Sequence, residues 1–408
     1  MDSSTVILHI AIILILARIL GEAVAYFNIP SVIGELVAGI LLGPTVLGLI
    51  EPTGLIQILA EIGVILLLFQ IGLETDIGNL KNAGRKSVTV ALGGFILPFI
   101  LCYSVSFYWF ELEMLTSLMI GGTMTATSIG ITMRILNDLG KSNSKEGQII
   151  LGAAVLDDIL GVLLLAILFD FSHNQQVDFA GAARIFLFMM IFFLVAPTLA
   201  KAISYLISRS ESSSMIPGII PTSIVSLVLF LAWLSHALGI PELLGGFATG
   251  LALSRRFFIP FGIALRANQD FSKHVNQQMQ PIIQLFTPIF FVSVGLSLDL
   301  SAVNWDSPFF WYFSLSLTAI AVVSKFGGAF LIKGKMANKI VIGMSMVPRG
   351  EVGLVFAELG RVSGVFNNEI YATTIIVIAY TTLFTPFWLR LFYKRYGKYI
   401  EDNSLSSK

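Results

Sequence analysis

The sequence predicts an all-α protein that crosses a membrane many times. Hydrophobic residues make up 56 % of its 408 positions and charged residues only 12 %, whereas soluble globular proteins carry about 25 % charged residues. Long apolar runs alternate with short polar stretches, which is typical of successive membrane-spanning helices. The 25 basic and 25 acidic residues balance, which argues against a basic nucleic-acid-binding face. The single cysteine, Cys102, excludes an internal disulfide framework and a cysteine-based metal site.

Thirteen apolar segments are long enough, or nearly so, to span a bilayer core, which needs about 20 helical residues. The first segment lacks the basic flank and small-residue cleavage site of a signal peptide. After the last segment only residues 394–408 remain, so we expect no soluble domain there. The segments cover 5–27, 31–50, 54–73, 86–109, 113–136, 146–169, 179–208, 219–238, 240–254, 280–298, 308–332, 337–360 and 368–393.

The lysines and arginines predict the orientation of these segments. With the N-terminus outside, 20 of the 25 basic residues fall in loops or ends on the inner side. Basic residues concentrate on the cytoplasmic side of membrane proteins, so we expect the N-terminus outside and the C-terminus in the cytoplasm. The exceptions are Arg184 and Arg361 on the outer side and Arg18, Lys325 and Arg349 within segments.

Two blocks of sequence recur in the same order. Residues 29–39 align with 240–250 at an offset of 211, and residues 68–76 align with 291–299 at an offset of 223. The first block opens a segment that runs outward, and its copy opens one that runs inward. This pattern predicts two five-helix units of opposite orientation, as in many transporters. Chance similarity between glycine-rich apolar stretches is the alternative.

Two segments at matching positions of these units contain poor helix formers. The fifth contains Thr123-Met-Thr-Ala-Thr-Ser-Ile-Gly130, and the twelfth contains Pro348-Arg-Gly-Glu-Val-Gly353. Glycine, threonine and proline weaken a helix, and unpaired backbone at membrane depth is tolerated only where it lines a polar cavity. The pair predicts crossed, interrupted helices at a binding site. For the fifth segment alone, close helix packing by small residues is the alternative.

Asp157 and Asp158 lie in the middle of the sixth, otherwise apolar segment. Each ionised carboxylate at that depth costs about 2.5–3.5 kcal/mol on insertion scales. A cation, a proton or a basic side chain must therefore compensate them. Adjacent helical residues point about 100° apart, so one carboxylate can face a cavity while the other faces a neighbouring helix.

Three further charged residues are candidates near this site. Lys325 lies mid-way along the eleventh segment beside Gly327 and Gly328, and the aspartate pair is its expected partner. A proton-releasing role and a purely structural ion pair are both open for it. Arg349 and Glu351 flank the weak point of the twelfth segment, and we expect them to neutralise the opposite dipoles of the cut helix ends.

Four motifs together identify a resemblance to the monovalent cation–proton antiporter superfamily. It covers residues 5–395, in the branch that contains NapA-type Na⁺/H⁺ antiporters and the membrane part of Kef-type K⁺/H⁺ systems. Each glycine-rich motif alone is weak, but the four in order around an intramembrane Asp-Asp are specific. The motifs are Pro30-Ser-Val-Ile-Gly-Glu-Leu-Val-Ala-Gly-Ile-Leu-Leu-Gly-Pro44, Leu66-Leu-Leu-Phe-Gln-Ile-Gly-Leu-Glu74, Ala154-Val-Leu-Asp-Asp-Ile-Leu-Gly161 and Pro348-Arg-Gly-Glu-Val-Gly-Leu354.

The resemblance implies roles for individual residues. Asp158 matches the aspartate that binds the cation and the proton, and Asp157 matches the preceding acid, which can pair with a lysine at the position of Lys325. Thr127 and Ser128 match the interrupted-helix positions beside the ion. The two aspartates are thus the expected ligands of the transported metal ion.

The resemblance also implies the architecture of the whole protein. We expect a homodimer of thirteen-helix protomers in the plasma or inner membrane, without a cofactor other than the transported Na⁺ or K⁺ and H⁺. Core helices would cover about 54–169 and 280–393, and scaffold and dimerisation helices about 5–50 and 179–254. Kef-type proteins have glutamine at the position of Asp157 and a C-terminal nucleotide-binding domain. This chain has neither feature, which favours Na⁺/H⁺ exchange.

The sequence therefore predicts an electrogenic Na⁺(Li⁺)/H⁺ antiporter that works by alternating access, with cation and proton competing for the aspartate pair. K⁺/H⁺ exchange on the same scaffold remains open, because oxygen ligands alone do not fix ion size. A cation channel would lack competition between cation and proton. An aspartyl protease needs two carboxylates facing each other across one water, which adjacent acids on one helix do not provide.

Overall fold

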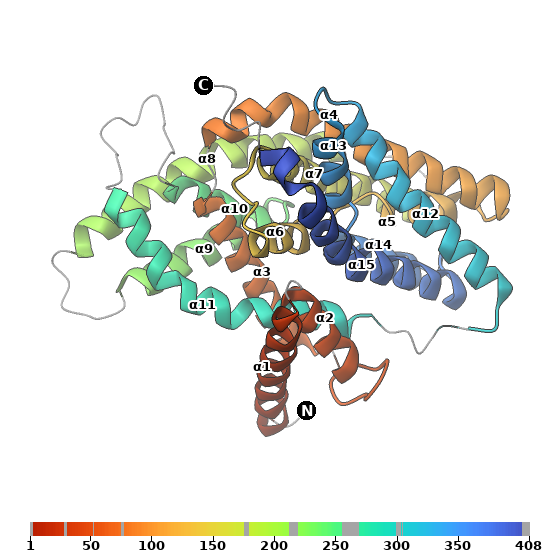
Figure 1. Ribbon diagram of the computed structural model, residues 1–408, viewed down its shortest axis with the longest axis horizontal. Helices are drawn as coiled ribbons and strands as arrows, with labels where there is room; N and C mark the ends of the chain where they lie inside the picture. Colours follow the sequence, from red (N-terminus) through yellow and green to blue (C-terminus); the bar gives the residue numbers. More distant parts are fainter. Residues whose placement is uncertain are drawn as a thin grey trace. The chain divides into compact units, whose positions relative to one another are not determined.

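The computed structural model describes residues 3–27, 31–51, 53–74, 77–174, 179–211, 219–254, 269–298, 303 and 305–401. Within these ranges the chain forms α-helices and one short π-helix, without a β-strand (Figure 1). The predicted inner-loop residues Arg255, Arg256 and Arg266 lie outside the described ranges.

The helices follow the predicted apolar segments along the chain. In order they are α1 (Ser3–Tyr26), α2 (Ser31–Leu42), α3 (Gly54–Glu74), α4 (Ile77–Ser104), η1 (Val105–Trp109), α5 (Met114–Thr123), α6 (Ile129–Asp138), α7 (Lys145–Asn174), α8 (Phe179–Glu211), α9 (Ile219–Ala237), α10 (Glu242–Leu253), α11 (Gln269–Leu296), α12 (Pro308–Phe330), α13 (Met336–Ser345), α14 (Glu351–Val362) and α15 (Asn368–Glu401).

The lengths and composition of the helices confirm the predicted all-helical membrane class. Among the described residues, nine helices are long and apolar enough to cross a membrane. The apolar helices α2, α5 and α10 are shorter, at 10 to 12 residues. The exact number of thirteen spans stays a prediction.

Helix ends differ from the predicted segment ends where an apolar stretch is not helical or where a helical stretch is polar. α2 ends at Leu42 and not near residue 50, because Pro44 follows Gly43 and the residue before a proline disfavours the helical conformation. α11 begins at Gln269, eleven residues before the predicted 280. Its first turns are polar, so an apolar search leaves them out although they continue the same helix.

Two of the predicted segments are interrupted. α5 ends at Thr123 and α6 begins at Ile129, while α13 ends at Ser345 and α14 begins at Glu351 (Figure 1). Both breaks fall where threonine, serine, glycine and proline accumulate, and they are 222 residues apart at either end. The poor helix formers thus interrupt the helix at matching places in the two predicted repeats.

The helices group into two compact units. The first comprises residues 1–15, 52–82 and 180–293, and the second comprises 16–51, 83–179 and 294–408. This grouping differs from the predicted core and scaffold, since α3 belongs with α9 and α10, and α2 belongs with α6 and α15. The predicted division describes which parts move, so it stays a prediction.

Within the first unit, glycines bring α3, α9 and α10 into close contact. A Cβ atom on Gly246 would lie 2.5 Å from the carbonyl oxygen of Ile65 in α3. One on Gly245 would lie 2.4 Å from the carbonyl oxygen of Leu231 in α9. Small residues let helix backbones approach closely, which is how helices associate in a membrane.

Within the second unit, long-range hydrogen bonds join helix ends that the charge pattern assigns to one side. The Ser87 hydroxyl donates to the Ile149 carbonyl at 3.1 Å, joining two predicted inner ends. The Thr116 hydroxyl donates to the Val365 carbonyl at 3.2 Å, joining two predicted outer ends. These contacts agree with the predicted alternation of the segments, while the absolute orientation stays a prediction.

Candidate functional site

Four ionisable side chains meet in the second unit, and all are fully buried. Asp157 and Asp158 come from α7, Lys325 from α12 and Arg349 from the break between α13 and α14. Lys325 lies within electrostatic reach of both aspartates and of Arg349. Two acids and two bases therefore share one site, which satisfies the requirement that buried charges be paired.

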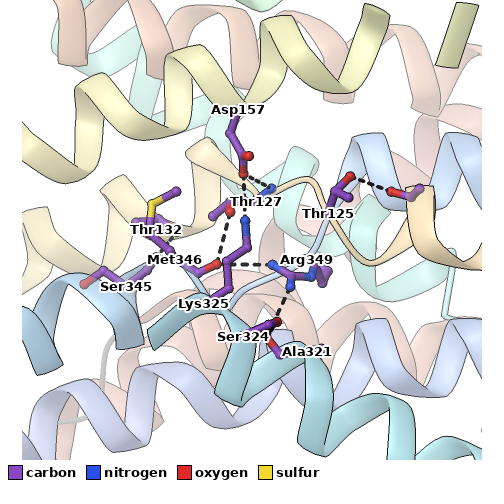
Figure 2. A network of polar contacts seen from close by, with 11 residues as sticks. Thr125, Thr127, Thr132, Asp157, Ala321, Ser324, Lys325, Ser345, Met346 and Arg349 are labelled. Atoms are coloured by element: carbon purple, nitrogen blue, oxygen red, sulfur yellow. Dashed lines mark hydrogen bonds and ion pairs between the residues drawn. The ribbon is translucent and has the colours of Figure 1, made fainter. Parts of the chain in front are cut away.

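Asp157 is the centre of this arrangement (Figure 2). Its Oδ2 atom lies 3.0 Å from Lys325 Nζ and also accepts a hydrogen bond of 2.9 Å from the Thr127 backbone N–H. That N–H belongs to the break between α5 and α6, where it has no helical carbonyl to bind. The break thus supplies a backbone dipole to a buried carboxylate.

Lys325 reaches Asp157 because its own helix packs closely on α4. A Cβ atom on Gly328 would lie 2.4 Å from the backbone nitrogen of Gly94, and one on Gly94 would lie 3.4 Å from Lys325 Cδ. The helix that packs on Gly327 and Gly328 is thus α4. The aliphatic stem of Lys325 therefore lies against glycine backbone.

The two interrupted helices contact each other through their backbones. The Ser128 N–H donates to the Pro348 carbonyl at 2.9 Å, and the Thr127 hydroxyl donates to the Met346 carbonyl at 3.0 Å. A Cβ atom on Gly350 would lie 2.6 Å from both Cβ and Oγ of Ser128. Glycine is therefore required for the two breaks to approach this closely.

Arg349 binds carbonyl oxygens on two elements. Its Nη1 donates to the Met346 carbonyl at 3.1 Å, and its Nη2 donates to the Ala321 carbonyl at 3.3 Å (Figure 2). Met346 follows the last residue of α13, where a helix carries partial negative charge. Ala321 lies one turn before Lys325 on α12, so Arg349 connects the break to the helix of the buried lysine.

The other predicted site residues are placed as follows. Asp158 is fully buried beside Asp157, and its position on the helix turns it about 100° away. The Ser128 hydroxyl caps α6 by accepting a hydrogen bond of 3.4 Å from the Ile131 N–H. Glu351 is the first residue of α14, but its side chain lies outside the part of the chain that the structure describes.

Sequence reasoning missed two features of this site. One is the Met346 carbonyl, which receives bonds from both Thr127 and Arg349. The other is Thr132, whose hydroxyl donates to the Ser345 carbonyl at 2.9 Å and so ties α6 to the end of α13. Backbone acceptors depend on where each helix stops. The sequence indicated these acceptors only through the poor helix formers of the fifth and twelfth segments.

Comparison with known proteins identifies the family. The sequence profile of the family described as "Sodium/hydrogen exchanger, transmembrane" matches residues 6–395. The chain is 34 % identical to the Na⁺/H⁺-K⁺ antiporter GerN of Bacillus cereus, over 93 % of this chain and 94 % of GerN. It is 30 % identical to the high-affinity Na⁺/H⁺ antiporter NhaS3 of Synechocystis sp., over 94 % of this chain and 89 % of NhaS3.

The fold is also that of a solved structure. The sodium proton antiporter MjNhaP1 from Methanocaldococcus jannaschii superimposes with a TM-score of 0.69 over 95 % of this chain and 99 % of its own, at 16 % identity. The family and the relatives are membrane transporters and not enzymes. This chain therefore belongs to the sodium/hydrogen exchanger family, within the monovalent cation–proton antiporter superfamily.

Proposed function

We propose that the protein is an electrogenic antiporter that exchanges cytoplasmic Na⁺ or Li⁺ for protons across the plasma or inner membrane. The relatives named Na⁺/H⁺ antiporters support sodium as the cation. The observation that carries the proposal is the fully buried Lys325–Asp157 pair, held at 3.0 Å against an interrupted helix. A charge pair of this kind can be opened by a competing cation.

Charge balance gives the physical reason for exchange. With Asp157, Asp158, Lys325 and Arg349 all ionised, the buried site is neutral. A monovalent cation that enters it adds one positive charge, which is costly away from water. Loss of a proton from Lys325 restores neutrality, whereas arginine does not deprotonate in proteins. Cation entry and proton release are therefore coupled within one site.

The resemblance to cation–proton antiporters supplies the proposed ligands. Deprotonated Asp158 and Asp157, the hydroxyls of Thr127 and Ser128 and water provide the oxygen donors that a small hard cation prefers. Binding of the cation opens the Asp157–Lys325 pair, and protonation with re-formation of the pair expels the cation to the other side. Arg349 and Glu351 act as fixed charges that compensate the cut helix ends.

Electrogenicity follows from the number of titratable groups. Loss of the Lys325 proton balances one cation, so electrogenic exchange needs a second proton, which one of the two carboxylates would carry when the cation is absent. A net charge then crosses the membrane, and each elementary charge contributes about 2.3 kcal/mol per 100 mV. Transport would thus respond to membrane potential.

The proposed architecture is thirteen spans in two inverted five-helix repeats, with a moving core and a scaffold that forms a homodimer. Matching glycine contacts support the repeat. A Cβ atom on Gly34 would lie 2.4 Å from the Leu20 carbonyl oxygen, and one on Gly245 would lie 2.4 Å from the Leu231 carbonyl oxygen. Both partners are offset by 211 residues, as the aligned blocks are.

K⁺/H⁺ exchange is the second candidate, and the name of GerN, an Na⁺/H⁺-K⁺ antiporter, favours it. Both cations would use the same oxygen ligands, so the alternatives differ in selectivity and not in mechanism. A cation channel on this scaffold would conduct without proton counter-transport.

Reconstitution into liposomes with an imposed pH gradient tests the proposal. Addition of Na⁺ or Li⁺ should collapse the gradient, and collapse by K⁺ alone would move the protein to the second candidate. The Asp158→Asn protein should lose all cation-dependent proton movement. Glu146→Gln is the matched control, because Glu146 is also a buried acid on α7 but lies at its first turn. Wild-type exchange by Asp158→Asn would end the proposal.

A further inference from the structure

A second group of charges lies at the other end of α6, away from the break. Arg134 Nη2 lies 3.6 Å from Glu35 Oε1 of α2, and Arg134 Nε lies 3.3 Å from Asp138 Oδ1 one turn further along α6. The Ser31 hydroxyl accepts from Arg134 Nη2 at 3.0 Å and donates to Asp138 Oδ2 at 3.4 Å. One guanidinium thus joins the beginning of α2 to the end of α6.

Glu35 is the buried member of this group, whereas the side chains of Arg134 and Asp138 are 21 % and 22 % exposed. Glu35 is only 5 % exposed, and its Oε2 atom is buried without a hydrogen-bond partner. Buried carboxylates need a compensating charge, and Arg134 is the base in contact with this one. The contact between α2 and α6 therefore depends on Arg134.

α6 connects this group to the proposed cation site. The helix has ten residues, with Ser128 as its N-cap and Asp138 as its last residue. Arg134 lies about 9 Å along the axis from Ser128, at 1.5 Å per residue. A helix this short moves as one piece, so holding its far end fixes the Thr127–Ser128 break.

The sequence repeat places this arrangement at only one side of the protein. Glu35 aligns with Gly246 at the offset of 211, and Arg134 aligns with Ala357 at the offset of 223. Gly246 packs directly on the Ile65 backbone of α3. The second repeat therefore has neither the acid nor the base at the positions that match Glu35 and Arg134.

We propose that Glu35, Arg134 and Asp138 form a charge latch that closes access to the cation site from the side where α2 begins and α6 ends. This inference rests on the proposed function, in which α2 belongs to the scaffold and α6 to the moving core. Arg134 is then a positioning residue: it holds the core against the scaffold in one access state and releases it in the other. The charge pattern predicts that this side is cytoplasmic.

Thiol accessibility tests the latch. Met133 is buried on α6 between the break and the latch, so Met133→Cys in a Cys102→Ser background reports access. A membrane-impermeant maleimide is applied to inside-out and right-side-out vesicles. The protein that carries only the reporter cysteine should be labelled slowly from both sides. Arg134→Ala should raise the labelling rate about tenfold or more from the latch side only, because the buried Glu35 carboxylate would lose the base that compensates it.

Two further variants separate a latch from general loosening. Arg134→Lys keeps a positive charge between Glu35 and Asp138 and should keep most of the protection. Arg361→Ala removes the exposed Arg361–Glu358 pair on α14 and should leave the labelling rate unchanged. Every variant should elute as a single monodisperse species in detergent, which shows that it is folded. Four results would each overturn the latch: rapid labelling of the protein that carries only the reporter cysteine, no effect of Arg134→Ala, an equal effect of Arg361→Ala, or an Arg134→Lys protein labelled as fast as Arg134→Ala. Labelling needs no transport, so absent exchange would refute the proposed function separately.

Discussion

At the level of single residues, Lys325 and Asp157 depend on each other. Both side chains are fully buried and 3.0 Å apart. Lys325→Gln leaves an uncompensated carboxylate, so we expect a loss of about 3–5 kcal/mol in stability unless Asp157 takes up a proton. Thermal unfolding in detergent measures this loss of stability relative to the wild type.

The same variant should change transport in a specific way. Exchange that persists in Lys325→Gln should respond less to an imposed membrane potential, because one titratable group has been removed. Lys333→Gln removes an exposed lysine just beyond α12 and should change neither property. Undiminished voltage dependence in Lys325→Gln would contradict the assigned role of the lysine.

The Thr127 hydroxyl has a testable role of its own. It donates to the Met346 carbonyl at 3.0 Å, while the Thr125 hydroxyl in the same break bonds locally to the Gly122 carbonyl at 2.7 Å. Thr127→Val removes a proposed oxygen ligand and a link between the breaks, so the half-saturating Na⁺ concentration should rise about fivefold to tenfold. Thr127→Ser should restore it, and Thr125→Val should not alter it. Equal effects of both valine variants would contradict this role.

The site could be predicted from sequence where a charge interrupts an apolar run. Asp157, Lys325 and Arg349 stand out because a charged side chain within the membrane is costly unless another group compensates it. The partnership of Arg134 with Glu35 could not be predicted, because both lie near segment ends, where a charged side chain normally reaches water. The one signal in the sequence that distinguishes Glu35 is its alignment with a glycine, Gly246, in the second repeat.

At the level of helices, the central feature is the contact between the two breaks. Gly350→Ala would place a Cβ atom 2.6 Å from Ser128 Oγ, so the breaks must separate. We expect a cost of about 1–3 kcal/mol and a loss of most transport from protein that still folds. Liposome exchange and detergent stability measure the two effects.

Gly84→Ala is the matched control for this change. Gly84 lies within α4, and a Cβ atom there would meet nothing within 4 Å. Alanine favours a helix over glycine, so this variant should be as active and at least as stable as the wild type. Full activity of Gly350→Ala would show that close approach of the breaks is not required.

Composition predicted where helices exist better than where they end. The breaks in the fifth and twelfth segments followed from threonine, glycine and proline content. The early start of α11 at Gln269 did not, because its polar turns continue a helix beyond the apolar span. Nor did the grouping of α3 with α10, which depends on glycine contacts between residues far apart in the sequence.

At the level of the whole molecule, the charge pattern fixes the expected topology. Fluorescent protein fused to the C-terminus should fluoresce in cells, and alkaline phosphatase fused there should be inactive, because the positive-inside rule places this end in the cytoplasm. Fusions at Glu111, in the predicted outer loop after η1, should give the reverse result. An active phosphatase at the C-terminus would reverse the predicted orientation.

The competition of cation and proton for one buried charge is the claim on which the mechanism depends. The most direct test is the half-saturating Na⁺ concentration of the reconstituted protein, measured at several pH values with equal pH on both sides. Competition predicts that it rises as pH falls, by up to about tenfold per pH unit. A half-saturating concentration that stays constant while only the maximal rate changes would contradict a shared site.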